Sequence, residues 1–303
     1  RAAGTNLIVG FVLGLAAFAT HAAALRIDWA AQGGTCSSLS PVLGRSLTSP
    51  LPRRLYAQWR QLLGRTPTGG VVARGGNGAM SMIAVGDTDS LLKLPDMYMR
   101  KMAVGPKARG AIDLAKPVGD NIRAIADAFG RMVNDVTTIV LDRPRHHDLI
   151  EEIRAAGARI KLIQDGDVTA SISAAIRGTN DHLAIGIGGT RQAVLTAAAL
   201  RCLGGELQAQ LWPTSRSEVE AAKEAGVEDL ERLFTIEDLA PGDVIVVATG
   251  VSNGDLLRGV RFLADSARTH SLVMCTRCNW VRFVDGIHFF ARERREEVRL
   301  LGY

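Results

Sequence analysis

The chain has 303 residues, of which 47% are hydrophobic and 22% charged, so it can bury a large core and is not intrinsically disordered. Its net charge of +5 is uneven: residues 1–86 hold eight arginines and one acid, Asp28, and the remainder carries −2. That remainder lacks the basic face and interleaved aromatics that polyanion binding needs, which excludes nucleic acid as an expected partner.

The first part of the chain differs in composition from the rest. It starts at Arg1 rather than Met, as expected of a fragment, a processed product or an incomplete gene model. Residues 7–25 form an apolar run that fits a membrane span, a secretory signal or a buried helix. Residues 26–65 are rich in Arg and Ser and nearly free of acid, as in organelle transit peptides. We expect residues 1–68 to be a leader, with a plastid location if it is a transit peptide and a cytoplasmic one otherwise. A form anchored in a membrane by residues 7–25 is a weaker alternative.

From residue 104 onward, short β-branched runs alternate with stretches of helical periodicity, which predicts a layered α/β core. A helix is predicted at 120–132, with Ile122, Ile125, Ala126 and Phe129 on one face, and a strand at 137–141. The next helix ends at Gly157 as its C-cap. Later strands are predicted at 158–163, 182–187 and 243–248. After the strand at 182–187 a helix is predicted with Ala193, Val194 and Ala197, and another opens with a capping box of Ser217 and Glu220.

The cysteines are few and mostly isolated. Cys36, Cys202, Cys275 and Cys278 are too few for a disulfide framework and are typical of a reducing compartment. Only Cys275 and Cys278 have CxxC spacing, which could mark a redox pair or half of a zinc site. No second CxxC or nearby His pair completes a metal site, so a hairpin turn between two strands is favoured.

Four strands run directly into segments that could carry chemistry: residues 142–146 (DRPRH), 165–167 (DGD), 186–190 (GIGGT) and 249–255 (TGVSNGD). Ligands in open α/β sheets bind at the carboxyl ends of strands, so we expect these four loops to converge on one crevice.

The residue types in these loops suit a phosphorylated polyol. Arg143 and Arg145 provide guanidinium groups for bidentate phosphate binding. Asp165 and Asp167 could hold sugar hydroxyls or help ligate a metal. The glycines of GIGGT open a helix whose free N–H groups attract an anion.

Each motif also has an ordinary reading. Taken singly, RPR could be a solvated turn, DGD a structural turn, and GxGG a site of close helix–strand packing. His146 and His147 lack a third ligand at metal spacing, so we expect them to face solvent or cap a helix and assign them no role.

Several longer segments carry a family resemblance: PDMYMRKMAVGPKARGAIDL (95–114), LDRPRH (141–146), AGARIKLIQDGDV (156–168), GIGG (186–189), ALRCLGGELQAQL (199–211) and ATGVSNGDLL (248–257). Over residues of about 70 to 300 the chain resembles class II fructose-1,6-bisphosphatases, in particular the cyanobacterial-type branch that also hydrolyses sedoheptulose-1,7-bisphosphate. The resemblance implies a layered α/β sugar-phosphatase fold with two subdomains, which we place at residues 69–135 and 136–303.

The resemblance also implies a function. The family removes the 1-phosphate of fructose-1,6-bisphosphate in gluconeogenesis or the Calvin cycle, with Mn²⁺ or Mg²⁺, and acts as a homo-oligomer. Matched motif by motif, the substrate-binding residues are Tyr98, Arg143, Arg145, Asp165, Asp167 and Gly189. No catalytic residue is assigned.

The metal ligands implied by the family do not carry over. The two acids of its D-P-(L/I)-E-G-T segment fall at Gly64 and Pro67, and the Glu of its A-P-E-G segment falls at Gln192. Two further acids are expected earlier in the chain, where Asp28 stands alone. Hard divalent ions need several carboxylates, so we expect no metal site. Two hypotheses follow: a bisphosphatase whose true N-terminal segment is missing from this sequence, or a catalytically inactive paralogue that binds sugar phosphates or an active subunit.

Overall fold

The structure is a computed structural model that describes residues 80–86 and 89–289. The expectations for residues 1–68, including those for Asp28, Gly64 and Pro67, lie outside these residues. Within them, no helix has both the length and the apolar character needed to cross a membrane.

The larger sheet has six strands in the order β4-β3-β5-β2-β6-β7. They are β2 (Tyr98–Val104), β3 (Thr137–Leu141), β4 (Arg159–Ile163), β5 (Leu183–Gly189), β6 (Glu206–Trp212) and β7 (Leu233–Phe234). β3 runs parallel to β4 and β5, whereas β2 is antiparallel to both β5 and β6. The parallel half follows from the βαβ alternation in the sequence, since parallel strands need a crossover connection.

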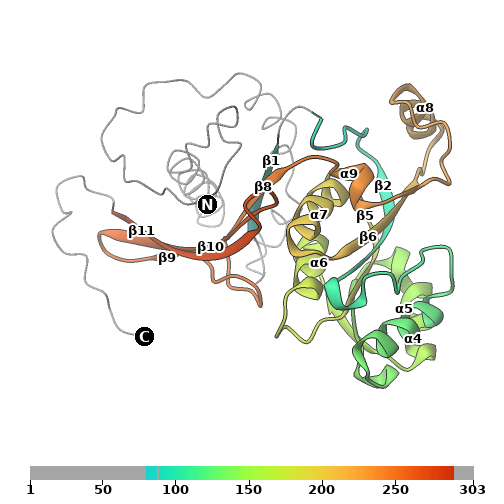
Figure 1. Cartoon of the computed structure of the whole chain (residues 1–303), viewed down its shortest axis with the longest axis horizontal. Helices are drawn as coiled ribbons and strands as arrows, with labels where there is room; N and C mark the ends of the chain where they lie inside the picture. The colour runs from blue at the N-terminus through green and yellow to red at the C-terminus, as the bar shows by residue number, and fades with distance from the viewer. Residues whose placement is uncertain (1–79, 87–88, 290–303) are drawn as a thin grey trace.

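Helices cover both faces of this sheet (Figure 1). On one face lie α4 (Val118–Phe129) and α5 (His147–Ala156), with the short turns η1 (Pro106–Ala108), η2 (Val133–Asp135) and η3 (Pro144–His146). On the other lie α6 (Asp167–Ala175), α7 (Thr190–Leu203) and α9 (Ile236–Leu239), while α8 (Arg216–Glu224) projects from the body. α7 is buried along most of its length because a second sheet packs on its far side.

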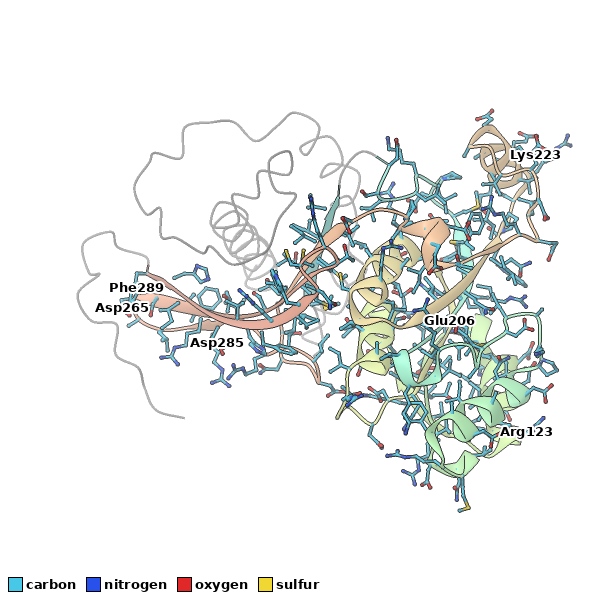
Figure 2. All side chains as sticks on the ribbon, in the orientation of Figure 1. Arg123, Glu206, Lys223, Asp265, Asp285 and Phe289 are labelled. Carbon is cyan, nitrogen blue, oxygen red and sulfur yellow. The ribbon has the colours of Figure 1, made fainter. Side chains whose placement is uncertain are left out.

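That second sheet is antiparallel, with the order β1-β8-β10-β11 and with β9 paired to β10. Its strands are β1 (Met80–Gly86), β8 (Val244–Gly250), β9 (Arg261–Phe262), β10 (Ser266–Cys275) and β11 (Trp280–Phe289). The β10–β11 hairpin continues past the helices, and Asp265, Asp285 and Phe289 lie on this extension (Figure 2). The layers therefore run sheet, helices, sheet, helices, which confirms the layered α/β class.

Most predicted elements are confirmed, with one shift in a helix start. Gly157 has φ +83° and caps α5, and residues 276–279 form the hairpin turn predicted for the CxxC segment. The cap of α8 is Ser215, whose hydroxyl accepts from the Glu218 N–H, and not Ser217. The sequence SRSEVE holds two overlapping S-x-x-E patterns, so the motif alone cannot choose between them.

Both sheets take strands from either side of the predicted subdomain boundary at residue 135: β1 pairs with β8, and β2 lies between β5 and β6. The division into 69–135 and 136–303 stays a prediction.

Candidate functional site

The carboxyl ends of three parallel strands, β3, β4 and β5, lie at the same end of the six-stranded sheet, and a polar loop follows each of them. β3 leads into Arg143 and Arg145, β4 into Asp165, and β5 ends at Gly189. The antiparallel β2 begins at the same edge, where Tyr98 pairs with Gly189 in the register. The structure thus brings together the strand ends that carry all six predicted substrate-binding residues. Whether they bind substrate stays a prediction.

The fourth expected loop has a different position. β8 belongs to the second sheet, so its carboxyl end does not join the other three. The loop after β8 still reaches the larger sheet, because Asp255 accepts from the Lys161 ammonium of β4 at 2.6 Å. Lys161 also contacts Asp181 at 3.1 Å, and these two carboxylates outweigh its desolvation and raise its pKa. The predicted convergence is therefore correct for three loops and wrong for the fourth, which lies against the β4 edge.

The two arginines of the RPR motif are held by backbone carbonyls. Arg145 donates from Nε and Nη2 to the Ile187 carbonyl at 3.3 and 2.9 Å, and its Cζ lies 5.0 Å from the centre of the Tyr98 ring. Arg143 donates from Nη2 to the Gln164 carbonyl at 2.8 Å. Each guanidinium keeps further N–H groups for an anion, which suits phosphate binding.

His146 and His147 were expected to face solvent or cap a helix, and His147 is exposed, while His146 stands at the N-cap position of α5. The His146 side chain is buried and makes no capping hydrogen bond, so the solvent-facing alternative is wrong for it. Its Nδ1–H donates to the Leu141 carbonyl at 2.8 Å, and its Nε2 accepts from the Ile187 N–H at 2.8 Å. Burial lowers the pKa of His146, and the nearby Arg145 and Arg143 lower it further. The neutral ring therefore ties the end of β3 to β5 and fixes the backbone that carries Arg145.

The two carboxylates of DGD have separate surroundings. Asp165 accepts from the Gly166 N–H at 2.9 Å, in the loop before α6. Asp167 lies 2.5 Å from the ammonium of Lys101, a buried residue of β2. The contact is an ion pair without hydrogen-bond geometry, since the ammonium has no hydrogen-bond partner among the described residues. The pair borders a cavity of about 20 Å³, which is room for one water molecule.

Lys101 is a site residue that the sequence reasoning missed. Its signal is a charged residue in the otherwise apolar second half of β2, where a buried Lys needs a partner. Gly188 makes room for the pair, because a Cβ at this position would clash with Asp167 Oδ2 and crowd Lys101 Nζ.

The described residues do not suit a divalent metal. The charge of Asp167 is neutralised by Lys101. Position 192, where the family motif implies a Glu, holds the neutral Gln192, whose amide oxygen lies against Gly189. Arg191 adds a positive charge and forms an ion pair with Asp96 at 3.5 Å. Within residues 80–86 and 89–289, no three His, Cys, Asp or Glu side chains gather to form a metal centre. Asp165 and Asp167 alone cannot balance two divalent ions.

Comparison with known proteins identifies relatives over most of the chain. The family described as "Bacterial fructose-1,6-bisphosphatase, glpX-encoded" matches residues 67–288. A D-fructose 1,6-bisphosphatase class 2/sedoheptulose 1,7-bisphosphatase of Synechococcus sp. (strain JA-3-3Ab) is 44% identical over 231 residues, covering 72% of this chain and 67% of the relative. A protein with the same description from Microcystis aeruginosa is 40% identical over 242 residues, covering 76% of this chain and 70% of the relative. Another from Gloeobacter violaceus is 41% identical over 231 residues, covering 72% of this chain and 67% of the relative.

Proposed function

The chain belongs to the class II fructose-1,6-bisphosphatase family of metal-dependent phosphoric monoester hydrolases, and we propose that its strand-end site binds fructose-1,6-bisphosphate, and also sedoheptulose-1,7-bisphosphate. One observation carries the proposal: Arg145 is fixed between the Ile187 carbonyl and the Tyr98 ring. This places a permanent positive charge beside Gly189 at the edge where three strands end. Arg143 and Asp165 would hold a phosphate and the sugar hydroxyls.

We further propose that this chain, with residues 1–79 as printed, releases little or no phosphate from the bound sugar. The reaction in this family needs metal ions, and the donor set of the described residues does not suit them. An enzyme whose genuine N-terminal segment supplies the missing acids is the first explanation. An inactive paralogue that binds sugar phosphates or an active subunit is the second, and Gln192 favours it because this substitution lies inside a matching stretch.

Calorimetric titration tests the binding step. The full chain would be titrated with fructose-1,6-bisphosphate in the presence and absence of Mn²⁺, beside Arg145→Gln and Arg123→Gln. Arg123 is a matched control, because it is an arginine on the outer face of α4 that pairs with Asp120 (Figure 2). We expect metal-independent binding that weakens roughly 10- to 100-fold in Arg145→Gln, as for the loss of one charged hydrogen bond, and is unchanged in Arg123→Gln. Failure of the wild-type chain to bind the sugar would refute the proposal.

Phosphate release tests the second step. Incubation of the same preparations with fructose-1,6-bisphosphate and Mn²⁺ or Mg²⁺ should give release at the level of the buffer alone. Rapid Mn²⁺-dependent release of phosphate by the wild-type chain, lost in Arg145→Gln, would refute this proposal. It would show that other residues of this chain supply the acidic metal ligands.

Assembly and location are further proposals from the family resemblance. We propose a homo-oligomer, to be checked by light scattering of the purified chain. We propose a plastid location if residues 1–68 act as a transit peptide, which an import assay with isolated plastids would test; failure of import would favour the cytoplasm.

A further inference from the structure

A second hollow lies on the α4/α5 face of the six-stranded sheet, next to the strand-end site. Its volume is about 370 Å³, within the range of small-molecule sites. Apolar side chains from β2, β5, α5, the start of α4 and the segment before it make much of its wall: Met102, Leu114, Val118, Leu149 and Ile185. Its charged side chains are three cations and one acid: Arg100, Lys116, Arg145 and Glu152. The hollow thus combines an apolar wall with an excess of positive charge.

Arg100 is fixed in this wall by a short chain of hydrogen bonds. It donates from Nη2 to Gln210 Oε1 at 2.7 Å, and Gln210 in turn donates to the Glu231 carboxylate at 2.5 Å and to its carbonyl at 3.1 Å. The guanidinium is therefore held in place by β6 and by the loop that precedes β7. A preorganised guanidinium loses little freedom when it binds an anion.

The Nε of Arg100 is buried and has no hydrogen-bond partner among the described residues. Buried donors are nearly always paired, because an unpaired donor has given up its bonds to water without replacing them. This Nε has almost no accessible surface, so an anion in the hollow would be bound by other guanidinium N–H groups of Arg100. The case for a ligand therefore rests on the lining of the hollow, in which Arg100, Lys116 and Arg145 face one acid, Glu152.

We propose that this hollow, the Arg100 pocket, binds a small organic anion whose single phosphate, phosphonate or carboxylate group contacts Arg100 and Lys116 and whose apolar body lies on Met102, Leu149 and Ile185. Glu152, which also lines the hollow, would repel a second anionic group. The apolar wall offers little to a chain of hydroxyls. The pocket therefore favours a different ligand from the sugar bisphosphates, which have many hydroxyls and two phosphate groups.

The pocket shares Arg145 and Ile187 with the strand-end site. An anion in the Arg100 pocket would attract the Arg145 guanidinium away from Tyr98 and so weaken sugar-phosphate binding. By linkage, the sugar phosphate would weaken the binding of the anion by the same factor. This coupling rests on the proposed function, whereas binding in the Arg100 pocket does not.

Phenylphosphonate is a suitable probe, because it joins one oxyanion to an apolar ring and its C–P bond resists phosphatases. Its binding to the full chain would be measured by calorimetry for wild type, Arg100→Gln, Lys116→Gln and the control Arg123→Gln. Lys116 is exposed, so its substitution should not impair folding if Arg100→Gln does. We expect binding to weaken at least tenfold in Arg100→Gln, severalfold in Lys116→Gln and not at all in Arg123→Gln. Inorganic phosphate, which has no apolar body, should bind more weakly than the probe.

Several results would overturn the proposal. The first is that phenylphosphonate does not bind to the wild-type chain. The second is that it binds equally well to wild type and to folded Arg100→Gln and Lys116→Gln. The third is that inorganic phosphate binds to the wild-type chain as tightly as phenylphosphonate does. If these two variants lose fructose-1,6-bisphosphate as well, the hollow is part of the sugar site and not a separate one. If the wild-type chain binds phenylphosphonate but no sugar bisphosphate, the proposed function fails and the Arg100 pocket stands.

Discussion

Replacing Lys101 by Met tests whether the buried ion pair with Asp167 holds the strand-end site together. Met keeps most of the volume and the apolar stem of Lys but removes the ammonium. The Lys101 and Asp167 side chains are 5% and 14% exposed, and their charged atoms are 2.5 Å apart. The substitution leaves a nearly buried carboxylate without its counter-charge.

The magnitude follows from the geometry. Two unit charges at this separation attract by about 6–7 kcal/mol at an effective dielectric constant of 20, and desolvation of the two ions cancels much of this gain. Removing one partner of a buried pair costs about 3–5 kcal/mol, because the other charge stays behind. Asp167 retains the Val168 N–H at 2.8 Å, so we expect a loss near the lower limit, about 3 kcal/mol.

Urea unfolding of wild type, Lys101→Met, Asp167→Asn and the double variant would measure this loss. With an m-value of about 3 kcal/mol/M, the midpoint of Lys101→Met should fall by about 1 M. The double variant should regain most of the stability, since it leaves no charge in the pocket. A loss in Lys101→Met below about 0.5 kcal/mol, or a double variant less stable than Lys101→Met, would refute the reasoning.

Three further predictions concern the same region and the cysteines. Gly188→Ala should lower the free energy of unfolding by about 1–3 kcal/mol, because the added Cβ clashes with Asp167. The control Gly119→Ala should not destabilise the chain, because a Cβ there meets only ordinary contacts. Thermal melts measure both variants, and equal melting temperatures for the two would contradict this prediction. His146 has a pKa lowered from 6.5 by burial and the adjacent arginines, so the unfolded chain takes up the proton first and stability falls as the pH drops below 6.5. His146→Gln should therefore flatten the acid limb of a stability–pH curve between pH 7 and 5, and an unchanged limb would argue against this role. Burial raises the pKa of Cys202 to about 12 and that of Cys275 to about 11. Iodoacetamide at pH 8 should therefore label neither thiol in the folded chain and both thiols in urea, as measured by mass spectrometry. Equal labelling of the folded and the unfolded chain would contradict the burial of these thiols.

The sequence predicted the elements that local patterns determine. The strand at 137–141 and the cap at Gly157 were correct because a β-branched run and a left-handed glycine are local features. β2 was not predicted, since it is a central strand that has buried side chains on both faces and so lacks a two-residue alternation. The second sheet depends on contacts between distant segments, such as β1 with β8, that no local pattern encodes.

The same limit applies to the site. Residue type and position after a strand were enough to place Arg143, Arg145 and Asp165 at one edge. The partnership of Lys101 with Asp167 was not predictable, because it depends on which face of β2 meets α6. The burial of His146 was missed for a similar reason, since its acceptor Leu141 and donor Ile187 come from different strands.

The pairing of β1 with β8 also constrains how the chain is made. About 160 residues separate the two strands, so at 5–20 residues per second a ribosome needs roughly 10–30 s after β1 before β8 exists. β2 similarly waits for both β5 and β6 before its buried faces are covered. During this interval Met82, Ala84 and Met99 would be exposed on unpaired strands, which are prone to aggregate. We therefore expect this chain to depend on chaperones during synthesis more than its final burial suggests, and a slower translation rate should lower its soluble yield unless a chaperone is co-expressed.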